Sequence, residues 1–492
     1  VRSFRSALRV KKFGACSKKQ LTFIDSEQSR RYKAPNNTCK AELAKMLDSV
    51  LKKIDENANR AIDAVKEICS IPSVAAKKQG IDETANLLMK MLEAVGIETQ
   101  LHPTAGSPVV TGYLDVGAKR TLLFYDHYDV QPAEPLELWD SPPFEPEIRN
   151  GRLYARGVAD NKGDTLSRIW ALRAYKEAGV KLPVNIKFVV EGEEEISSPN
   201  LPDFTKKHAN FLKADGGIWE FGSAGFDGTQ EAWLGLKGIL YVQFEVQRIS
   251  HNAHSSNSSI LPSAPFRLVW ALSSLKDEKE RIQIKGFYDD VVPMTKKERE
   301  FVAKIDFEEN ARRKFWKIDK FVNNYEGEDL REAYYYLPHL SIDGLTSGYQ
   351  EEGSMTVLPA KASAKIDFRL VENQHPEDIV KKLRNHLDAK GFSDVKIAWY
   401  DGYPAAKTPI DHPFVKIVER ANQKVYGHAL RVHPTTPGSG PLYLFKDHVP
   451  MVSIGIGDSE SRGHSPNESA AVDNFVKAMK RIAVVIDEMG KW

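Results

Sequence analysis

The strongest constraint on the fold is an alternation of strand and helix patterns between about residues 41 and 235. Residues 121–125 (TLLFY) and 184–190 (VNIKFVV) are short apolar runs, as buried strands require. Between them, residues 164–179 repeat apolar side chains at helical spacing and end at a glycine, which is a common helix C-cap. Residues 214–219 (ADGGIW) form a weaker strand candidate. This alternation predicts an α/β layered domain.

A different pattern occupies residues 236–404. Residues 238–248 (GILYVQFEVQR) and 362–370 (ASAKIDFRL) alternate apolar and polar side chains, which is typical of antiparallel strands with one wet face. The α/β pattern then resumes with a helix at 413–426, a strand at 451–456 and a helix at 471–489. We therefore predict one α/β domain, residues 42–235 and 405–492, interrupted by an inserted α+β domain, residues 236–404.

Composition limits the functional class. A chain of 492 residues with 41% hydrophobic residues is long enough for two domains and a sizeable core. A formal net charge of +2 argues against a dedicated nucleic-acid partner, and no apolar run is long enough to span a membrane. The three cysteines, Cys16, Cys39 and Cys69, are too few and too dispersed for a disulfide framework, which favours a cytoplasmic location.

The amino-terminal segment differs from the rest. Residues 1–24 are rich in arginine and lysine and contain no acidic residue. We predict a disordered basic leader over residues 1–41, with an organelle transit peptide as the alternative.

A histidine and a carboxylate follow the strand at 121–125. His127 and Asp129 lie where the carboxyl end of a buried strand carries ligands in an open α/β sheet. His127 would offer one ring nitrogen to a metal, and Asp129 could hold the opposite N–H. The alternative for this motif alone is a surface turn.

The strand at 184–190 is followed by a run of carboxylates, residues 191–195 (EGEEE). Such a run is usually a solvated face. At a strand end, however, crowded carboxylates repel one another unless a cation is present. One glutamate could then be a ligand, and its neighbour a base.

Further candidate ligands occur at similar positions. Asp160 lies in a glycine-bounded loop before a helix, where it is either a bridging carboxylate or the helix N-cap. Glu220 follows residues 214–219, and His464 follows the strand at 451–456. Histidine and carboxylate ligands without cysteine suit zinc, manganese or cobalt.

Together these segments resemble the M20 family of metallopeptidases, in particular its carnosine-dipeptidase-like branch. The similarity covers the chain from about residue 43 to its end and implies a phosphorylase/hydrolase-like α/β sandwich with an inserted α+β lid and dimerisation domain. The motifs that carry it are LLFYDHYDVQP (122–132), WDSPPFEP (139–146), GRLYARGVADNKG (151–163), LPVNIKFVVEGEEE (182–195), GFYDDV (286–291), GSGPLYLF (438–445) and GHSPNE (463–468).

The resemblance implies two divalent ions, zinc first, with manganese or cobalt as alternatives. One ion would bind His127 and Glu220, the other Glu195 and His464, and Asp160 would bridge both. Because the family uses Asp or Glu at the position of Glu220, neighbouring Asp215 stays open as its competitor.

The resemblance also implies roles in catalysis. Glu194 matches the general base for a metal-bridged hydroxide, and Asp129 matches the partner of His127. His254 of the lid would reach the active site of the other subunit in a homodimer. Here Asn252-Ala253-His254 stands where the family commonly has Asp-Leu-His.

Substrate binding is implied for four residues. Arg369 matches the arginine that binds the substrate carboxylate, with a strand-end salt bridge as the alternative. The turn formed by Gly438, Ser439 and Gly440 would bring backbone N–H groups close to that carboxylate.

The predicted function is hydrolysis of dipeptides or short peptides with a free C-terminal carboxylate. A second enzymatic alternative is an N-acyl- or N-succinyl-amino-acid amidohydrolase, which would share the metal chemistry. A non-catalytic scaffold on the same fold is the alternative from another class. The expected partners are a small peptide and a second copy of the chain, with no nucleic acid and no membrane.

Overall fold

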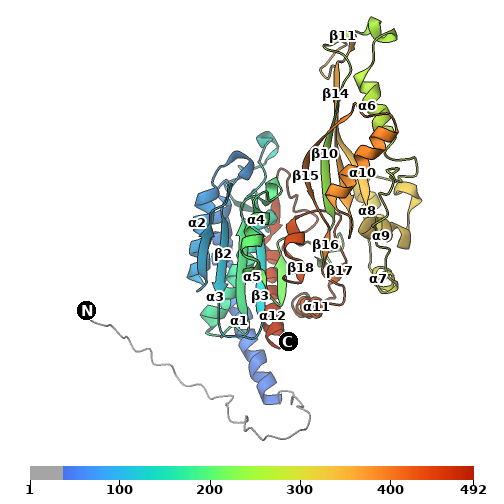
Figure 1. Ribbon diagram of the computed structural model, residues 1–492. Helices are drawn as coiled ribbons and strands as arrows, with labels where there is room; N and C mark the ends of the chain where they lie inside the picture. The colour runs from blue at the N-terminus through green and yellow to red at the C-terminus, as the bar shows by residue number, and fades with distance from the viewer. Residues whose placement is uncertain (1–36) are drawn as a thin grey trace.

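A computed structural model describes residues 37–492 (Figure 1). Most of the predicted leader, residues 1–36, lies outside the described residues. Helix α1 (Asn37–Cys69) begins within the segment that was predicted as leader. No helix in the described part of the chain is long and apolar enough to cross a membrane.

A mixed eight-stranded sheet forms the centre of the α/β domain. Strand β3 is parallel to β6 and β7, and β18 is parallel to β7, so the carboxyl ends of these four strands lie at one edge. The strands predicted at 121–125, 184–190, 214–219 and 451–456 are confirmed as these four. In spatial order the sheet contains β1 (Glu98–His102), β2 (Val109–Leu114), β6 (Asn185–Glu191), β3 (Thr121–His127), β7 (Gly216–Trp219), β18 (Met451–Ser453), β8 (Glu231–Trp233) and β17 (Arg431–His433).

Helices cover both faces of this sheet (Figure 1). Both faces of strand β3 are apolar and must be covered. Leu122 and Phe124 belong to one apolar core, and Leu123 and Tyr125 belong to another. A strand buried on both faces reads as a continuous apolar run, which is how its position could be predicted. The main helices of this layer are α1, α2 (Ile81–Ala94), α3 (Gly163–Ala178), α4 (Leu201–Lys207), α5 (Ala209–Leu212), α11 (Pro413–Tyr426) and α12 (Val472–Gly490).

A second, antiparallel sheet forms the lid. Its order is β12 (His339–Ser347), β14 (Lys361–Leu370), β10 (Gly238–Gln247) and β15 (Lys396–Tyr403). Helices α6 (Ala264–Ser273) and α10 (Pro376–Ala389) pack on one face. Alternate residues of β10 are buried beneath them, and the intervening ones are half-buried or exposed. The predicted strands with one wet face are therefore confirmed.

The chain enters and leaves the lid at adjacent points. Strands β9 (Gly235–Leu236) and β16 (Ala406–Lys407) pair with each other in antiparallel fashion. The α/β domain is thus interrupted by an α+β unit, as the fold class predicted, while the boundaries at 236 and 404 stay predictions. The remaining elements are β4 (Glu147–Arg149), β5 (Arg152–Tyr154), β11 (Ala253–His254), β13 (Val357–Leu358), β19 (Ser469–Ala471), α7 (Lys296–Val302), α8 (Glu309–Trp316) and α9 (Gly327–Tyr336), with short turns of helix between them.

Candidate metal centre and substrate cleft

Five of the predicted ligands meet at the carboxyl edge of the large sheet. His127 ends β3, and its Nε2 lies 3.1 Å from Asp160 Oδ1 and 3.4 Å from Glu220 Oε2. On the other side, His464 Nε2 lies 2.9 Å from Asp160 Oδ2 and 3.1 Å from Glu195 Oε2. Asp160 therefore faces the two histidines with separate oxygens, the arrangement that a bridging carboxylate needs.

Asp215, the competitor of Glu220, lies elsewhere. Its carboxylate accepts hydrogen bonds from Arg120 Nη1 at 2.7 Å and from the N–H of Thr121 at 2.9 Å. Thr121 begins β3, whereas His127 ends it. Of the two residues that the sequence left open, only Glu220 lies beside His127.

Glu194 lies within the same cluster. His127, Glu194 and Glu220 each offer a potential ligand atom within 4.8 Å of the others, and so do His127, Asp160 and Glu195. The neighbouring Glu193 is turned away, because Ser107 and Asn200 hold its carboxylate. The geometry alone allows Glu194 to be either a ligand or a base.

The donor set fits divalent cations. Glu220 Oε2 is buried and has no hydrogen-bond partner in the described chain, so one acceptor of the cluster is left for an ion. Burial raises the pKa of Glu220 to about 8, with His127 lowering it and the Asp160 carboxylate raising it. Burial and the Glu220 carboxylate also raise the pKa of Glu194. A bound cation relieves the repulsion between these neighbouring carboxylates. Histidine and carboxylate side chains together are suitable ligands for zinc, manganese and cobalt.

Asp129 contacts both His127 and the short helical turn that carries Glu194 and Glu195, called the glutamate turn below. His127 Nδ1 lies 3.1 Å from the backbone oxygen of Asp129 and 3.4 Å from its Oδ1. The Asp129 carboxylate also accepts the N–H groups of Glu194 at 3.2 Å and Glu195 at 3.1 Å. Asp129 can therefore orient the imidazole, as predicted for it, and in addition fixes the start of the turn η4 (Glu194–Ile196).

Glu468 supports Asp160 in a way that the sequence did not indicate. Its buried carboxylate accepts the N–H groups of Gly157 at 3.0 Å, Ala159 at 2.9 Å and Asp160 at 3.1 Å, and it pairs with Arg156 at 2.7 Å. Asp160 itself lies in the turn η3 (Val158–Lys162) before α3 and caps no helix, so its alternative reading as an N-cap was wrong. The only signal for Glu468 was its presence in the GHSPNE motif.

Arg168 is a second supporting residue that sequence reasoning missed. It is buried in α3, and its guanidinium donates to the backbone oxygens of Tyr125 at 2.9 Å and of Trp219 and Glu220 at 3.0 Å each. It also pairs with Asp126. One side chain thus ties together the ends of β3 and β7, the strands that carry His127 and Glu220.

The predicted carboxylate-binding residues contact one another near Glu194. Arg369 Nη1 donates to Ser439 Oγ at 2.9 Å, and Arg369 Nε donates to Asp367 at 2.6 Å. The turn of Gly438, Ser439 and Gly440 is held in place by the N–H of Lys237, which donates to the Gly438 oxygen at 2.9 Å. A Cβ added to Gly440 would lie 3.9 Å from Glu194 Oε1, so this backbone passes close to the carboxylate. Arg369 thus makes both the strand-end salt bridge and a contact with the glycine turn.

His254 is the one predicted site residue that lies apart from the cluster in a single chain. It is in β11, at the outer end of the lid (Figure 1). Its ring nitrogens lie 2.9 Å from Ser256 Oγ and 3.1 Å from Thr356 Oγ1, and both of these residues also belong to the lid.

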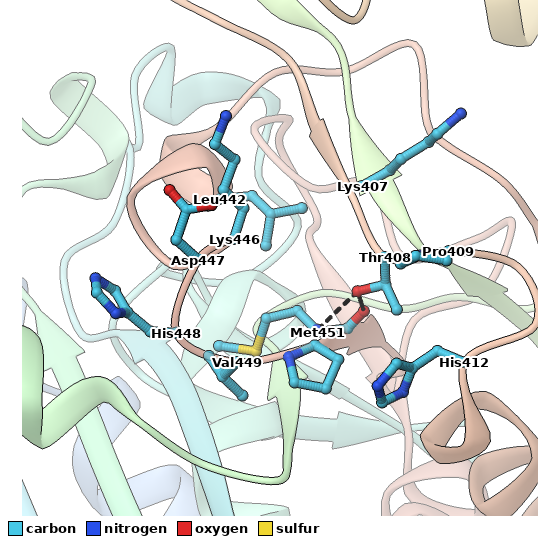
Figure 2. Close-up of a pocket in the computed structure, with 11 residues that line it drawn as sticks. Lys407, Thr408, Pro409, His412, Leu442, Lys446, Asp447, His448, Val449 and Met451 are labelled. Carbon is cyan, nitrogen blue, oxygen red and sulfur yellow. Dashed lines mark hydrogen bonds between the residues drawn. The ribbon is translucent and has the colours of Figure 1, made fainter.

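Figure 2 shows a separate cavity of about 310 Å³ at the start of β18. Two of its polar side chains, those of Thr408 and Lys407, already have partners. Thr408 Oγ1 exchanges hydrogen bonds with the backbone of Met451 at 2.7 and 2.8 Å, and the Lys407 ammonium lies 2.7 Å from both Glu298 and Glu372. Because β18 ends at the edge that carries the histidines, this cavity lies at the opposite edge of the sheet.

Comparison with known proteins identifies relatives along most of the chain. The model of peptidase family M20/M25/M40 matches residues 123–488. A Cys-Gly metallodipeptidase of Schizosaccharomyces pombe is 29% identical over 90% of this chain and 98% of its own length. The Beta-Ala-His dipeptidase of Homo sapiens is 28% identical over 91% of this chain and 93% of its own length.

Solved structures agree with these matches. An M20 family metallo-carboxypeptidase from Sulfolobus solfataricus superposes with a TM-score of 0.84 at 36% identity, covering 88% of this chain and 99% of that one. A di-peptidase of Saccharomyces cerevisiae superposes with a TM-score of 0.80 at 26% identity, covering 91% of this chain and 99% of that one.

Proposed function

The chain belongs to peptidase family M20/M25/M40, and from that premise we propose that it is a dinuclear-metal dipeptidase. Its substrates are dipeptides or short peptides with a free C-terminal carboxylate. The observation that carries this proposal is Asp160, whose two oxygens face His127 at 3.1 Å and His464 at 2.9 Å.

The five clustered side chains would hold two divalent ions. His127 and Glu220 would bind one, Glu195 and His464 the other, and Asp160 would bind both, with zinc as the first choice. When bound, such ions would polarise the scissile carbonyl and lower the pKa of the attacking water towards about 7.

Glu194 would move the proton. Its carboxylate would accept a proton from the attacking water and deliver it to the leaving nitrogen, a role that contributes typically about 10²–10⁴-fold to the rate. The position of Glu194 between the ligand cluster and the glycine turn supports this role, because the scissile bond must meet both.

Arg369 and the turn of Gly438, Ser439 and Gly440 would orient the substrate. The guanidinium would bind the C-terminal carboxylate through charge-assisted hydrogen bonds. The N–H groups of the glycine turn would approach the same carboxylate. The hydrogen bond between Arg369 and Ser439 supports a joint action of these two elements.

We infer that a homodimer completes the active site. Helix α6 presents Phe266, Val269 and Trp270 to solvent, an apolar surface that a second lid would cover. In a symmetric dimer, His254 of each chain would enter the other chain's cleft and donate to the developing oxyanion. Its exposure at the end of the lid supports an action across the dimer.

The His254→Ala variant is expected to stay folded and dimeric and to lose about 10²–10³-fold in kcat, the usual cost of one oxyanion donor. Mixed with Glu194→Gln chains, it should regain activity, because a mixed dimer contains one site with an intact Glu194 and the partner's intact His254. Random pairing in a one-to-one mixture gives about a quarter of wild-type activity. No recovery in freshly formed mixed dimers would mean that His254 does not act across the dimer.

A cytoplasmic location forms part of the proposal. Cys69 is a buried free thiol, as expected in a reducing compartment.

A substrate panel tests the reaction class. Metal-loaded protein should cleave Cys-Gly and β-Ala-His faster than N-acetyl or N-succinyl amino acids. Amidation of the dipeptide C-terminus should raise KM, because Arg369 loses its anionic partner. Preference for the acylated amino acids would instead favour the amidohydrolase alternative, and no turnover of either group would favour a non-catalytic protein.

A further inference from the structure

A cavity of about 420 Å³ lies between the glutamate turn and the open face of the lid sheet. Ile196 and Pro199 line it from the catalytic domain, and Ile239, Tyr241 and Tyr400 line it from the lid. None of these residues has a part in the proposed reaction. A space of this size is in the usual range for small-ligand sites.

Two of the residues that line the cavity lie beside proposed catalytic or substrate-binding residues. Ile196 belongs to the turn η4, which also carries Glu194. Ile239 lies opposite Arg369 in the lid sheet, and residues opposite each other in an antiparallel pair project from the same face. Two of the lining residues are therefore neighbours of the proposed catalytic groups: Ile196 shares a turn with the proposed base, and Ile239 lies across the sheet from the proposed carboxylate-binding arginine.

The position determines which part of a substrate can reach the cavity. If the scissile bond lies at Glu194 and the terminal carboxylate at Arg369, the C-terminal residue spans the distance between them. Its side chain then points either along the cleft wall or into this cavity. This step rests on the proposed function.

The lining favours an apolar side chain. The rings of Tyr241 and Tyr400 meet edge to face with their centroids 6.3 Å apart, and two isoleucines and a proline add further apolar surface beside Ser197. The charged lining residues, Lys365 and Asp401, are of opposite sign. An aromatic side chain of a substrate could make the same edge-to-face or offset-stacked contacts with these rings.

We propose that this cavity binds the side chain of the substrate's C-terminal residue and selects large apolar side chains, aromatic ones above all. Burial of a phenylalanine side chain in place of a hydrogen should raise kcat/KM by about 10–100-fold. The residues that set the preference are Tyr241 and Tyr400, with Ile196 and Ile239 as the floor.

The test compares Ala-Gly, Ala-Leu, Ala-Phe and Ala-Glu as substrates of the metal-loaded full chain. The expected order of kcat/KM is Ala-Phe above Ala-Leu above Ala-Gly, with Ala-Glu below Ala-Leu. Tyr241→Ala should lower kcat/KM for Ala-Phe about 10-fold and leave Ala-Gly within about twofold, because glycine has no side chain to place in the cavity. Turnover of Ala-Gly also reports that the variant is folded.

The matched control is Tyr113→Ala. Tyr113 lies in β2 opposite Lys187, near the start of β6 and therefore at the edge of the sheet away from the histidines, so neither substrate should be affected. A flat substrate profile, a preference for Ala-Glu, or an equal loss on both substrates in Tyr241→Ala would overturn the subsite while leaving the dipeptidase assignment intact. Failure of the metal-loaded protein to cleave any dipeptide would overturn the assignment, and the subsite with it.

Discussion

The Glu194→Gln variant is expected to lose about 10²–10⁴-fold in kcat while keeping its metal. Glutamine has nearly the same shape as glutamate but no basic oxygen, so the proton of the attacking water has no acceptor. The measurement pairs turnover of a dipeptide with metal analysis of the same sample. Unchanged metal content separates a base from a ligand, the two roles that the position of Glu194 beside His127 and Glu220 allows.

The control for this variant is Glu193→Gln, the same change one residue earlier. Its carboxylate is bonded to Ser107 and Asn200 and faces away from the cluster, so kcat should stay within about threefold of wild type. Near-normal turnover in Glu194→Gln would remove Glu194 as the base. Loss of one metal equivalent in Glu194→Gln would make it a ligand instead.

The Asp160→Ala variant should lose both metal binding and activity. Each oxygen of Asp160 faces a different histidine, so its removal weakens both ion positions together. Bound metal lowers the activation free energy of hydrolysis by several kcal/mol, and about 1.36 kcal/mol corresponds to a tenfold change in rate. The expected loss in kcat/KM is therefore about 10³-fold or more. Metal content per chain after gel filtration and dipeptide turnover measure the two effects.

Asp215→Asn is the control, because the sequence left Asp215 open as an alternative to Glu220 as a metal ligand. Its contacts are with Arg120 and Thr121 at the far edge of the sheet, so metal content and turnover should be retained. Full metal occupancy in Asp160→Ala, or metal loss in Asp215→Asn, would contradict the ligand set.

The strands that carry the cluster could be predicted because they are buried on both faces. A run such as TLLFY has no polar interruption, so the first polar side chains after it mark the strand end, where His127 lies. The choice between Asp215 and Glu220 could not be made in this way, since each lies at one end of the short strand β7. Only the strand direction, visible in its parallel pairing with β3, separates them.

The supporting residues could not be predicted from local patterns. Glu468 and Arg168 are buried charges whose partners are backbone groups far away in the chain, and spacing along the sequence does not encode such contacts. Helices α7, α8 and α9 were also missed, because they are short; α7 and α9 contribute to a small local core that includes Val302 and Tyr335, and α8 buries no side chain. The structure of one chain does not test the proposed role of His254. That role would be played in the active site of a second copy of the chain.

Metal stoichiometry tests the central claim most directly. Protein stripped with a chelator is titrated with Zn²⁺, and bound metal per chain is measured by plasma mass spectrometry alongside dipeptide turnover. We predict that the stripped protein is inactive and that turnover is restored as occupancy approaches two ions per chain. Full activity with one ion or none, or turnover that the chelator leaves unchanged, would contradict a paired-metal site built around Asp160.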